Sequence, residues 1–295
     1  SKLHTTFRRF YTRQPRTRVT KMASTSEINR FYNINTTFDT KAFSNALTTN
    51  HIGRCFTFFK QTESTMAIAK SIGAQGAPTG TVVLADSQTQ GKGRQGRKWS
   101  SDPGNIYVSF LLRPLAAKEL NKLNFVCCIA VAQAAKEHGI DAKVKWPNDV
   151  WVNDKKLAGM LIDTQFMGKN IEAVLGIGVN VNQDMTKVSD PEVSKVATSV
   201  FNEIGKQASR EAFLAAMCNS METMLGKEMA EIMKVYKSLD LLEGKQINVM
   251  PKGRDGDVKK PAKPVGYSDD GCLMVEYADG TTDTLMVGDV SIRPQ

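Results

Sequence analysis

Segment 175–182, with the sequence LGIGVNVN, limits the fold of this chain more than any other stretch. Successive side chains of a β-strand point to opposite faces, so the alternation predicts a strand with one face of Leu, Ile and Val. The opposite face holds Gly176, Gly178, Asn180 and Asn182. Glycine weakens a strand and usually marks the close approach of a ligand or another backbone. We therefore expect a sheet strand that packs on a core and bears a shallow slot ending in an amide.

Further strands and helices are predicted on both sides of this segment. We expect strands at 54–60, 81–85, 105–112, 143–146, 158–165 and 171–182, and helices at 40–47, 64–72, 120–138, 195–204 and 210–239. Asn153-Asp154 predicts a hairpin turn. After Glu243-Gly244 the chain consists of short apolar runs separated by Asp-Gly turns, which is typical of a small β-barrel. The Lys- and Pro-rich stretch 259–264 is predicted to be a hairpin loop in that barrel.

The net charge of +9 belongs to one end of the chain. Of the 39 Lys and Arg residues, seven precede the first acid, Glu27. The rest of the chain therefore has 32 Lys and Arg residues and 30 Asp and Glu residues, so its charges nearly balance. The Arg-rich, acid-free composition of this end is typical of a mitochondrial transit peptide, and the alternative is a disordered basic arm with no targeting role. Met22 follows the basic residues, and initiation there would give a cytosolic form.

Several classes of protein are excluded by composition. No apolar run approaches the roughly 18 residues that would span a bilayer. The five cysteines form no C-x-x-C pair, so we expect no zinc site and a reducing compartment. The three histidines lie far in sequence from plausible Ser or Cys nucleophiles. We therefore expect charge and hydrogen bonding, rather than a histidine-based triad, to carry any chemistry.

Segment 91–99, with the sequence GKGRQGRKW, is the strongest local motif. Its glycines permit close backbone approach, so that successive N–H groups can converge on an anion. Its four cations suit a phosphate or a carboxylate, and Trp99 can cover an apolar or π-faced ligand. The alternatives are a solvated basic loop or a nucleic-acid-binding segment rich in Arg and Gly.

Segment 145–149, with the sequence KWPND, is a second candidate. Pro147 fixes the direction of the chain, which would present Asn148 and Asp149 at an inflexible turn. The alternative is an ordinary hairpin entrance in which Asn and Asp serve only as turn residues.

Taken together, these segments resemble the motifs of the biotin–protein ligase (holocarboxylase synthetase) family. The family pattern G-R-G-R-x-G-R-x-W corresponds to 91–99, K-W-P-N-D to 145–149, K-x-x-G-(I/M)-L to 156–161 and G-x-G-x-N to 176–180. Their order and spacing also agree, and the resemblance covers about 55–293. Two positions depart from the pattern. Lys92 replaces an Arg, which removes the planar fork, and Met66 replaces the Asn of the common S-T-N.

The resemblance implies an α+β fold. We expect a mixed β-sheet with flanking helices, as in the class II synthetase-like catalytic domain of biotin/lipoate ligases, and a small C-terminal SH3-like β-barrel. The expected boundaries are a basic disordered arm or transit peptide at 1–37, a biotin- and ATP-binding domain at 38–242 and the barrel at 243–295. Repressor members carry a winged-helix domain, but only about fifty residues precede the catalytic body here, without a helix-turn-helix pattern. Gene repression is not expected.

The resemblance also implies an activity. The expected enzyme is an ATP-dependent ligase that forms biotinyl-5′-AMP with Mg²⁺ and then transfers biotin to a lysine. The acceptors would be the biotin-acceptor (carboxyl carrier) domains of carboxylases, with AMP and diphosphate as the other products. It would act as a monomer or homodimer in mitochondria, cytoplasm or both, with no nucleic-acid or membrane partner. No protein ligands to a metal are expected, because Mg²⁺ would arrive with ATP.

Roles follow for the residues that match the family motifs. Biotin would be bound by Ser64, Thr65, Gln88, Lys92, Gly93, Arg94 and Lys156, and ATP or the adenylate by Arg97, Lys98, Trp99, Asn148, Asn180 and Arg293, with Asp289 near the loop. Lys156, Asp149 and Arg94 are the expected catalytic residues. Lys156 would stabilise the adenylate, and Asp149 would assist loss of a proton from the acceptor lysine, as a base or as an electrostatic partner. The alternatives are a lipoate–protein ligase, which shares the adenylation chemistry, and a basic nucleic-acid-binding protein.

Overall fold

The computed structural model describes residues 38–168, 170–250, 259–286 and 291–294. The expected arm at 1–37, the Asp255-Gly256 turn and Asp289 lie outside the described residues. No helix within the described ranges is both long enough and apolar enough to cross a membrane.

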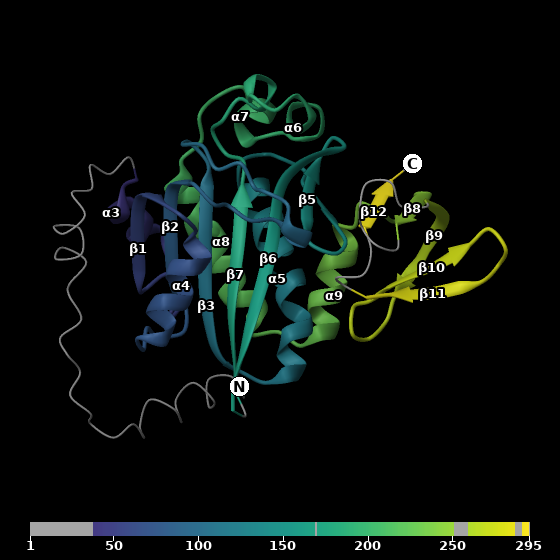
Figure 1. Ribbon diagram of the computed structural model, residues 1–295, viewed down its shortest axis with the longest axis horizontal. Helices are drawn as coiled ribbons and strands as arrows, with labels where there is room; N and C mark the ends of the chain where they lie inside the picture. The colour runs from purple at the N-terminus through teal and green to yellow at the C-terminus, as the bar shows by residue number, and fades with distance from the viewer. Residues whose placement is uncertain (1–37, 169, 251–258, 287–290, 295) are drawn as a thin grey trace. The chain divides into compact units, whose positions relative to one another are not determined.

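A mixed sheet forms the centre of the larger part (Figure 1). Across the described residues its order is β1-β2-β3-β7-β6-β5-β4, with β1 (Phe56–Thr62), β2 (Thr81–Gln88), β3 (Ile106–Leu115), β4 (Lys143–Lys145), β5 (Asp149–Val152), β6 (Lys155–Met167) and β7 (Asn170–Val179). β1 and β2 are parallel, and the other neighbours are antiparallel. The expected strand 171–182 is confirmed as β7 up to Val179, and residues 180–182 lie beyond its end. Asn153-Asp154 forms the turn between β5 and β6 with both residues at positive φ.

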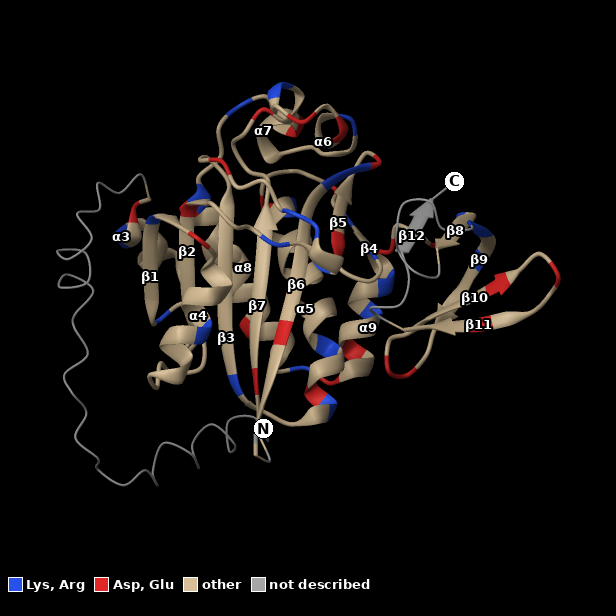
Figure 2. Cartoon of the chain, viewed as in Figure 1, with Lys and Arg blue, Asp and Glu red and all other residues tan. Residues whose placement is uncertain are grey.

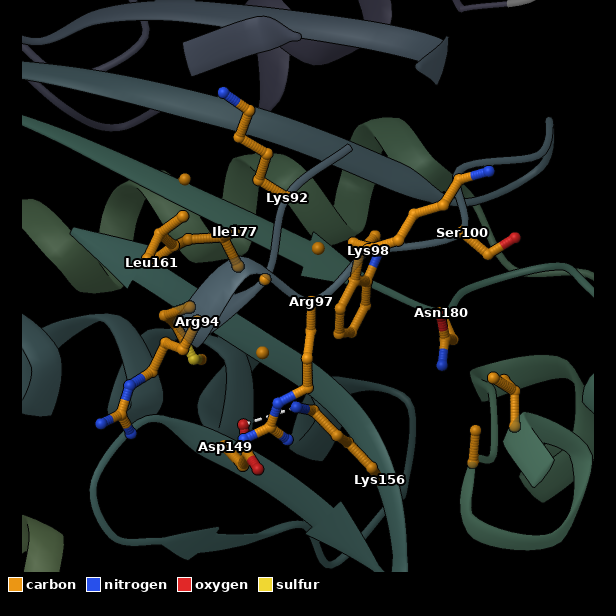
Figure 3. A pocket seen from close by; sticks show the side chains of 18 of the residues that line it. Lys92, Arg94, Arg97, Lys98, Ser100, Asp149, Lys156, Leu161, Ile177 and Asn180 are labelled. Atoms are coloured by element: carbon orange, nitrogen blue, oxygen red, sulfur yellow. Dashed lines mark ion pairs between the residues drawn. The ribbon is translucent and has the colours of Figure 1, made fainter. Parts of the chain in front are cut away.

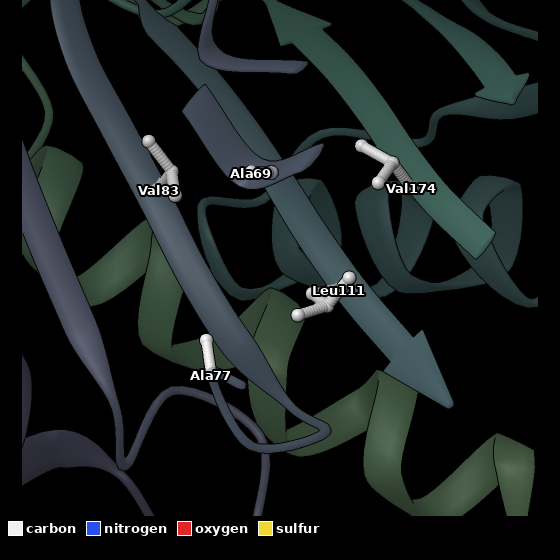
Figure 4. Close-up of a cluster of buried hydrophobic side chains, with 5 residues drawn as sticks. All are labelled: Ala69, Ala77, Val83, Leu111 and Val174. Atoms are coloured by element: carbon white, nitrogen blue, oxygen red, sulfur yellow. The ribbon is translucent and has the colours of Figure 1, made fainter. Parts of the chain in front are cut away.

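Helices cover both faces of this sheet. α4 (Thr65–Ala74) lies against β2, β3 and β7, whereas α5 (Ala117–Glu137) packs on β4 to β7 from the other side, together with α8 (Arg210–Leu225), against which α3 (Thr40–Ala46) rests. Beneath α4 a cluster of buried side chains links the helix to the strands (Figure 4), and it consists of Ala69, Ala77, Val83, Leu111 and Val174. The sheet face under α4 therefore has a rigid apolar base at one end.

Two expected helices are each interrupted. The predicted helix 195–204 is interrupted: α6 (Pro191–Val196) ends at Val196, and α7 (Val200–Ile204) begins only after Ser199, whose side chain accepts from the N–H of Asn202. The predicted helix 210–239 consists of α8 and α9 (Met229–Ser238), separated at Gly226. For α7 the missed signal was Ser199, because a side chain that satisfies a free N–H group of the first turn starts a new helix.

A second, antiparallel sheet follows. Among the described residues its order is β11-β10-β9-β8-β12, from β8 (Ile247–Met250), β9 (Lys260–Tyr267), β10 (Leu273–Tyr277), β11 (Thr282–Leu285) and β12 (Ser291–Pro294). The predicted hairpin loop at 259–264 is wrong, because most of it lies in β9. Pro261 pairs only with β8 and Pro264 only with β10, so each proline, which lacks an N–H, has a side without a ladder partner.

Candidate functional site

A pocket of about 280 Å³ opens on the sheet face beside α4. The expected site residues that line it are Ser64, Thr65, Gln88, Lys92, Gly93, Arg94, Arg97, Lys98, Trp99, Asn148, Asp149, Lys156 and Asn180. The fold thus gathers segments that lie more than a hundred residues apart in the sequence. Arg293 belongs to β12, where its backbone pairs with Asn248, and its side chain is outside the described part of the structure.

Two cross-strand rows make the floor of this pocket. Ser109 of β3, Gly176 of β7 and Leu161 of β6 are directly paired, and Tyr107, Gly178 and Gly159 form the next row on the same face. Directly paired residues of antiparallel strands project on one side of a sheet. The glycines therefore leave two gaps in an otherwise filled face.

Side chains of the protein itself occupy both gaps. A Cβ on Gly176 would lie 2.6 Å from Sδ of Met66, and one on Gly178 would lie 2.5 Å from Nε1 of Trp99. The ring of Trp99 also reaches Gly159, where a Cβ would lie 3.0 Å from Cζ3. The slot expected from the sequence is therefore real, and its floor is covered by Met66 and Trp99. Nε1 of Trp99 is buried without a hydrogen-bond partner among the described residues.

A chain of hydrogen bonds defines the polar end of the pocket. Oε1 of Gln88 accepts from the backbone N–H of Thr65 at 2.9 Å and from its hydroxyl at 3.2 Å. Ser109, which is fully buried, donates to the hydroxyl oxygen of Thr65 at 2.8 Å, and Nε2 of Gln88 donates to Ser101 at 3.1 Å. Each hydroxyl and amide is oriented by its neighbour, so this end offers fixed donors and acceptors.

An ion pair defines the charged end. Nζ of Lys156 lies 2.7 Å from Oδ1 of Asp149, and their side chains are 28% and 19% exposed (Figure 3). Burial by itself would raise the pKa of Asp149, but the positive charges of Lys156 and Lys145 outweigh it, so that the pKa of this carboxyl is lowered from its usual value. The Asp149 carboxylate is consequently held ionised.

The basic loop forms a small hairpin of its own. Gly93 donates its N–H to the carbonyl of Arg97 at 2.7 Å, and Trp99 donates to Gly91 at 2.9 Å, while Gln95 turns the chain at φ 55°. The expectation that N–H groups of this loop converge on an anion is therefore wrong for Gly93 and Trp99, whose N–H groups are used inside the hairpin.

Arginine and lysine side chains of this loop differ in direction. Lys92 and Lys98 are exposed and point away from the ion pair, whereas Arg97 extends toward it (Figure 3). Arg94 is partly buried, and its Nη1 donates to Oδ1 of Asn148 at 3.0 Å. Burial and the nearby Arg97 charge lower the pKa of Arg94, although Asp149 opposes them. Figure 2 shows the Lys and Arg positions of this loop, in blue, where it passes in front of β7 and β6.

The two asparagines of the pocket are held by backbone carbonyls. Nδ2 of Asn148 donates to Met160 at 2.6 Å, and Nδ2 of Asn180 donates to Thr198 at 3.0 Å. The turn before Asn148 is fixed as well, because the buried Trp146 donates from Nε1 to the carbonyl of Gly271 at 3.2 Å. Hydrogen bonds from two of its side chains thus hold the K-W-P-N-D turn in place, which an ordinary hairpin entrance would not require.

Sequence reasoning missed several residues of the pocket wall. Lys145 lies in the motif but received no role, and an apolar group after β7 received none either: Met185, Val188, Val193, Val196 and Ala197. Val196 is 55% exposed. The signal was a set of valines in a polar stretch, which the expected helix 195–204 obscured.

Known proteins share both the sequence and the fold. The sequence model of the Biotin/lipoate A/B protein ligase family matches residues 58–180. The chain is 31% identical over 238 residues to the bifunctional ligase/repressor BirA of Bacillus subtilis (strain 168), which covers 79% of this chain and 73% of that protein. The Biotin protein ligase from Aquifex aeolicus in complex with biotin and ATP superposes with a TM-score of 0.68 at 29% identity, over 82% of this chain and all of that one.

A third relative is the biotin protein ligase from Leishmania major in complex with biotinyl-5-AMP, with a TM-score of 0.54 and 25% identity over 79% of this chain and 99% of that chain. The chain belongs to the biotin/lipoate A/B protein ligase family, and within it to the biotin–protein ligases. The expected α+β fold, with a mixed sheet, flanking helices and a small C-terminal antiparallel sheet, is confirmed.

Proposed function

We propose that this chain is a biotin–protein ligase that forms biotinyl-5′-AMP and transfers the biotin to a lysine of a carboxylase acceptor domain. The observation that carries the proposal is a single pocket with a neutral hydrogen-bonding end, an apolar floor and a cationic end. Biotin has the same three parts in the same order: a urea, an apolar ring with its chain, and a carboxylate. Adenylation chemistry needs the cationic end next to that carboxylate.

The polar end suits the urea ring. Thr65 and Gln88 offer hydroxyl and amide groups that their own hydrogen bonds hold in place. A neutral ring gains specificity from such fixed partners, because an analogue without the matching groups would leave them buried and unpaired. Biotin bound in this way would direct its chain along the floor toward Lys156.

The cationic end suits adenylate formation. A carboxylate oxygen of biotin would attack the α-phosphorus of ATP while the bond to diphosphate breaks, which brings two anions together. Lys156, Arg94 and Arg97 would offset that repulsion and the charge that develops on diphosphate. Mg²⁺ would supply further charge neutralisation as part of the nucleotide. Within the described residues no group of three or more His, Cys, Asp or Glu side chains is arranged to hold a metal ion.

Biotin transfer requires a neutral amine. The acceptor lysine would lose its proton, its nitrogen would attack the carbonyl carbon of the adenylate, and AMP would leave. The lowered pKa of Asp149 makes this carboxylate a weak proton acceptor while it is paired with Lys156. We therefore assign Asp149 the role of an electrostatic partner that orients Lys156 and attracts the incoming ammonium group, ahead of the role of a base.

Two activities test the proposal. Biotin should stimulate exchange of labelled diphosphate into ATP, and biotin plus ATP should label a biotin-acceptor domain that is then detected with streptavidin. Lipoate in place of biotin should support neither activity, which separates this function from that of a lipoate–protein ligase. Exchange with lipoate, or none with biotin, would contradict the proposal.

A cellular location is proposed for the N-terminal end, which lies outside the described residues. Its acid-free, Arg-rich composition supports import into mitochondria, with a cytosolic form from Met22. A fluorescent reporter fused after residues 1–20 should collect in mitochondria, and the same reporter with the arginines of this segment replaced by Gln should stay cytosolic. A uniformly cytosolic signal from the first fusion would mean that the segment is a basic arm without a targeting role.

A further inference from the structure

The side chain of Met66 separates the apolar core under α4 from the pocket. Met66 is the second residue of α4 and is partly buried. It packs against the buried cluster drawn in Figure 4, and it also lines the pocket. No residue role assigned above uses it, although its Met departs from the Asn expected at this position.

Gly176 shows how closely Met66 is fitted. A Cβ on Gly176 would lie 2.6 Å from Sδ and 2.8 Å from Cγ of Met66, whereas the next neighbour, the carbonyl oxygen of Leu161, would be at an ordinary 3.6 Å. The backbone at Gly176 is in no left-handed conformation that would require glycine. Within the described residues, the thioether of Met66 is therefore what a side chain at position 176 would displace.

The position of Met66 along the pocket indicates what it would touch. Met66 follows Thr65 of the polar end in the chain, and its thioether lies against Gly176, the middle residue of the row formed by Ser109, Gly176 and Leu161. With the urea at Thr65 and the carboxylate at Lys156, the sulfur-containing ring of biotin falls beside Met66. Methionine is unbranched and polarizable, so it can adapt its shape to that ring.

We propose that Met66 is a specificity-determining residue, whose thioether sets the width of the acyl site where the ring of the substrate lies. This inference rests on the proposed function and deepens it. Replacing Met66 by a smaller residue widens the site toward ring-substituted ureido acids. Adding a Cβ at Gly176 narrows it, because the displaced thioether moves toward the substrate.

Wild type and three variants test this as a cycle: Met66→Ala, Gly176→Ala and the double variant. The assay is diphosphate exchange with biotin and with biotin sulfone, which is bulkier at the ring sulfur, and it gives kcat and KM for each. Met66→Ala should raise the ratio of kcat/KM for the sulfone over biotin by about tenfold, the scale on which pockets discriminate single small groups. Gly176→Ala should raise KM for biotin about tenfold with little change in kcat.

The double variant gives the sharpest result. In the Met66→Ala background the added Cβ at position 176 meets no thioether, so Gly176→Ala should then cost less than about threefold, and the two changes should be strongly non-additive. Met66→Leu, which keeps the volume, should retain the wild-type preference. Ile72→Ala is the matched control, because Ile72 packs on the same cluster from the same helix without lining the pocket. Its loss of stability should leave the sulfone-to-biotin ratio unchanged.

The outcomes separate the inference from the function beneath it. A wild-type chain without biotin-dependent exchange overturns the proposed function. If the wild type is active but Met66→Ala and Ile72→Ala have the same ratio of kcat/KM for biotin sulfone over biotin, the assignment to Met66 alone is overturned. An additive cycle overturns it as well. Thermal unfolding of each variant, followed by circular dichroism, confirms that the compared proteins are folded.

Discussion

At one end of the pocket the buried Thr65 donates two hydrogen bonds to Gln88 and accepts one from the buried Ser109, whereas Lys92, Arg97 and Lys98 are exposed on the short hairpin of residues 91–99. The urea of a neutral ring is recognised by directional hydrogen bonds, which are most effective when their partners are held in place before binding. An anion is attracted over longer distances, so its partners need less exact placement. One end of this pocket is therefore preformed, whereas the other end consists of long charged side chains.

The Lys156–Asp149 pair, which defines the charged end, gives the largest expected effect. Lys156→Gln removes the charge next to the proposed position of the biotin carboxylate at similar length, so diphosphate exchange should fall by about 10² or more, a loss of about 3 kcal/mol of transition-state stabilisation. Lys155→Gln, at an exposed neighbour outside the pocket, is the control. An equal loss in both variants would show that the site lacks this dependence on one cation.

Gln88→Leu tests the preformed end. The change removes the acceptor of two hydrogen bonds from Thr65 and leaves those donors without a fixed partner. KM for biotin should rise about thirtyfold, which corresponds to about 2 kcal/mol, while KM for ATP changes little. Gln90→Leu, at an exposed position two residues further on, should leave both constants unchanged. A parallel rise in both KM values would mean that the two ends are not independent.

Arg94→Ala tests the hairpin end with a smaller effect. It removes the contact to Asn148 and one positive charge over the expected adenylate, so preformed biotinyl-AMP should escape about tenfold faster. The measurement is the half-life of the complex after gel filtration, together with labelling of unrelated lysines nearby. Arg94→Lys keeps a charge without the planar fork, so its rate of biotinyl-AMP escape should lie between those of wild type and Arg94→Ala. Unchanged retention would remove the loop from the adenylate site.

The smallest effect concerns pH and the ion pair. Because the folded pKa of Asp149 lies below its usual value of about 3.9, the pair stabilises the fold above that value and loses its contribution as pH falls through the folded pKa. The difference in unfolding free energy between wild type and Asp149→Asn should be constant from about pH 5 to 8 and shrink below about pH 4. Urea denaturation at each pH measures it. A difference that changes between pH 6 and 8 would imply a raised pKa instead.

Much of the site was already determined by the sequence. The alternation at 175–182 specifies a face with glycines, because a strand has a period of two, and the K-W-P-N-D segment specifies a rigid turn. The sequence of the loop at 91–99 specifies the positive charges of the site. Local patterns of this kind depend on neighbours in the chain, so they can be read without knowledge of the fold.

Tertiary structure alone decided what lies against those patterns. That Met66 covers Gly176 and that Trp99 covers Gly178 follows from the packing of α4 and of the 91–99 hairpin on β7, between residues about 80 to 110 positions apart. The pairing of Lys156 with Asp149, which lowers the pKa of a carboxylate expected from the sequence to act as base or electrostatic partner, also arises across two strands. Sequence fixes which groups are present, whereas their energies depend on distances that only the folded chain sets.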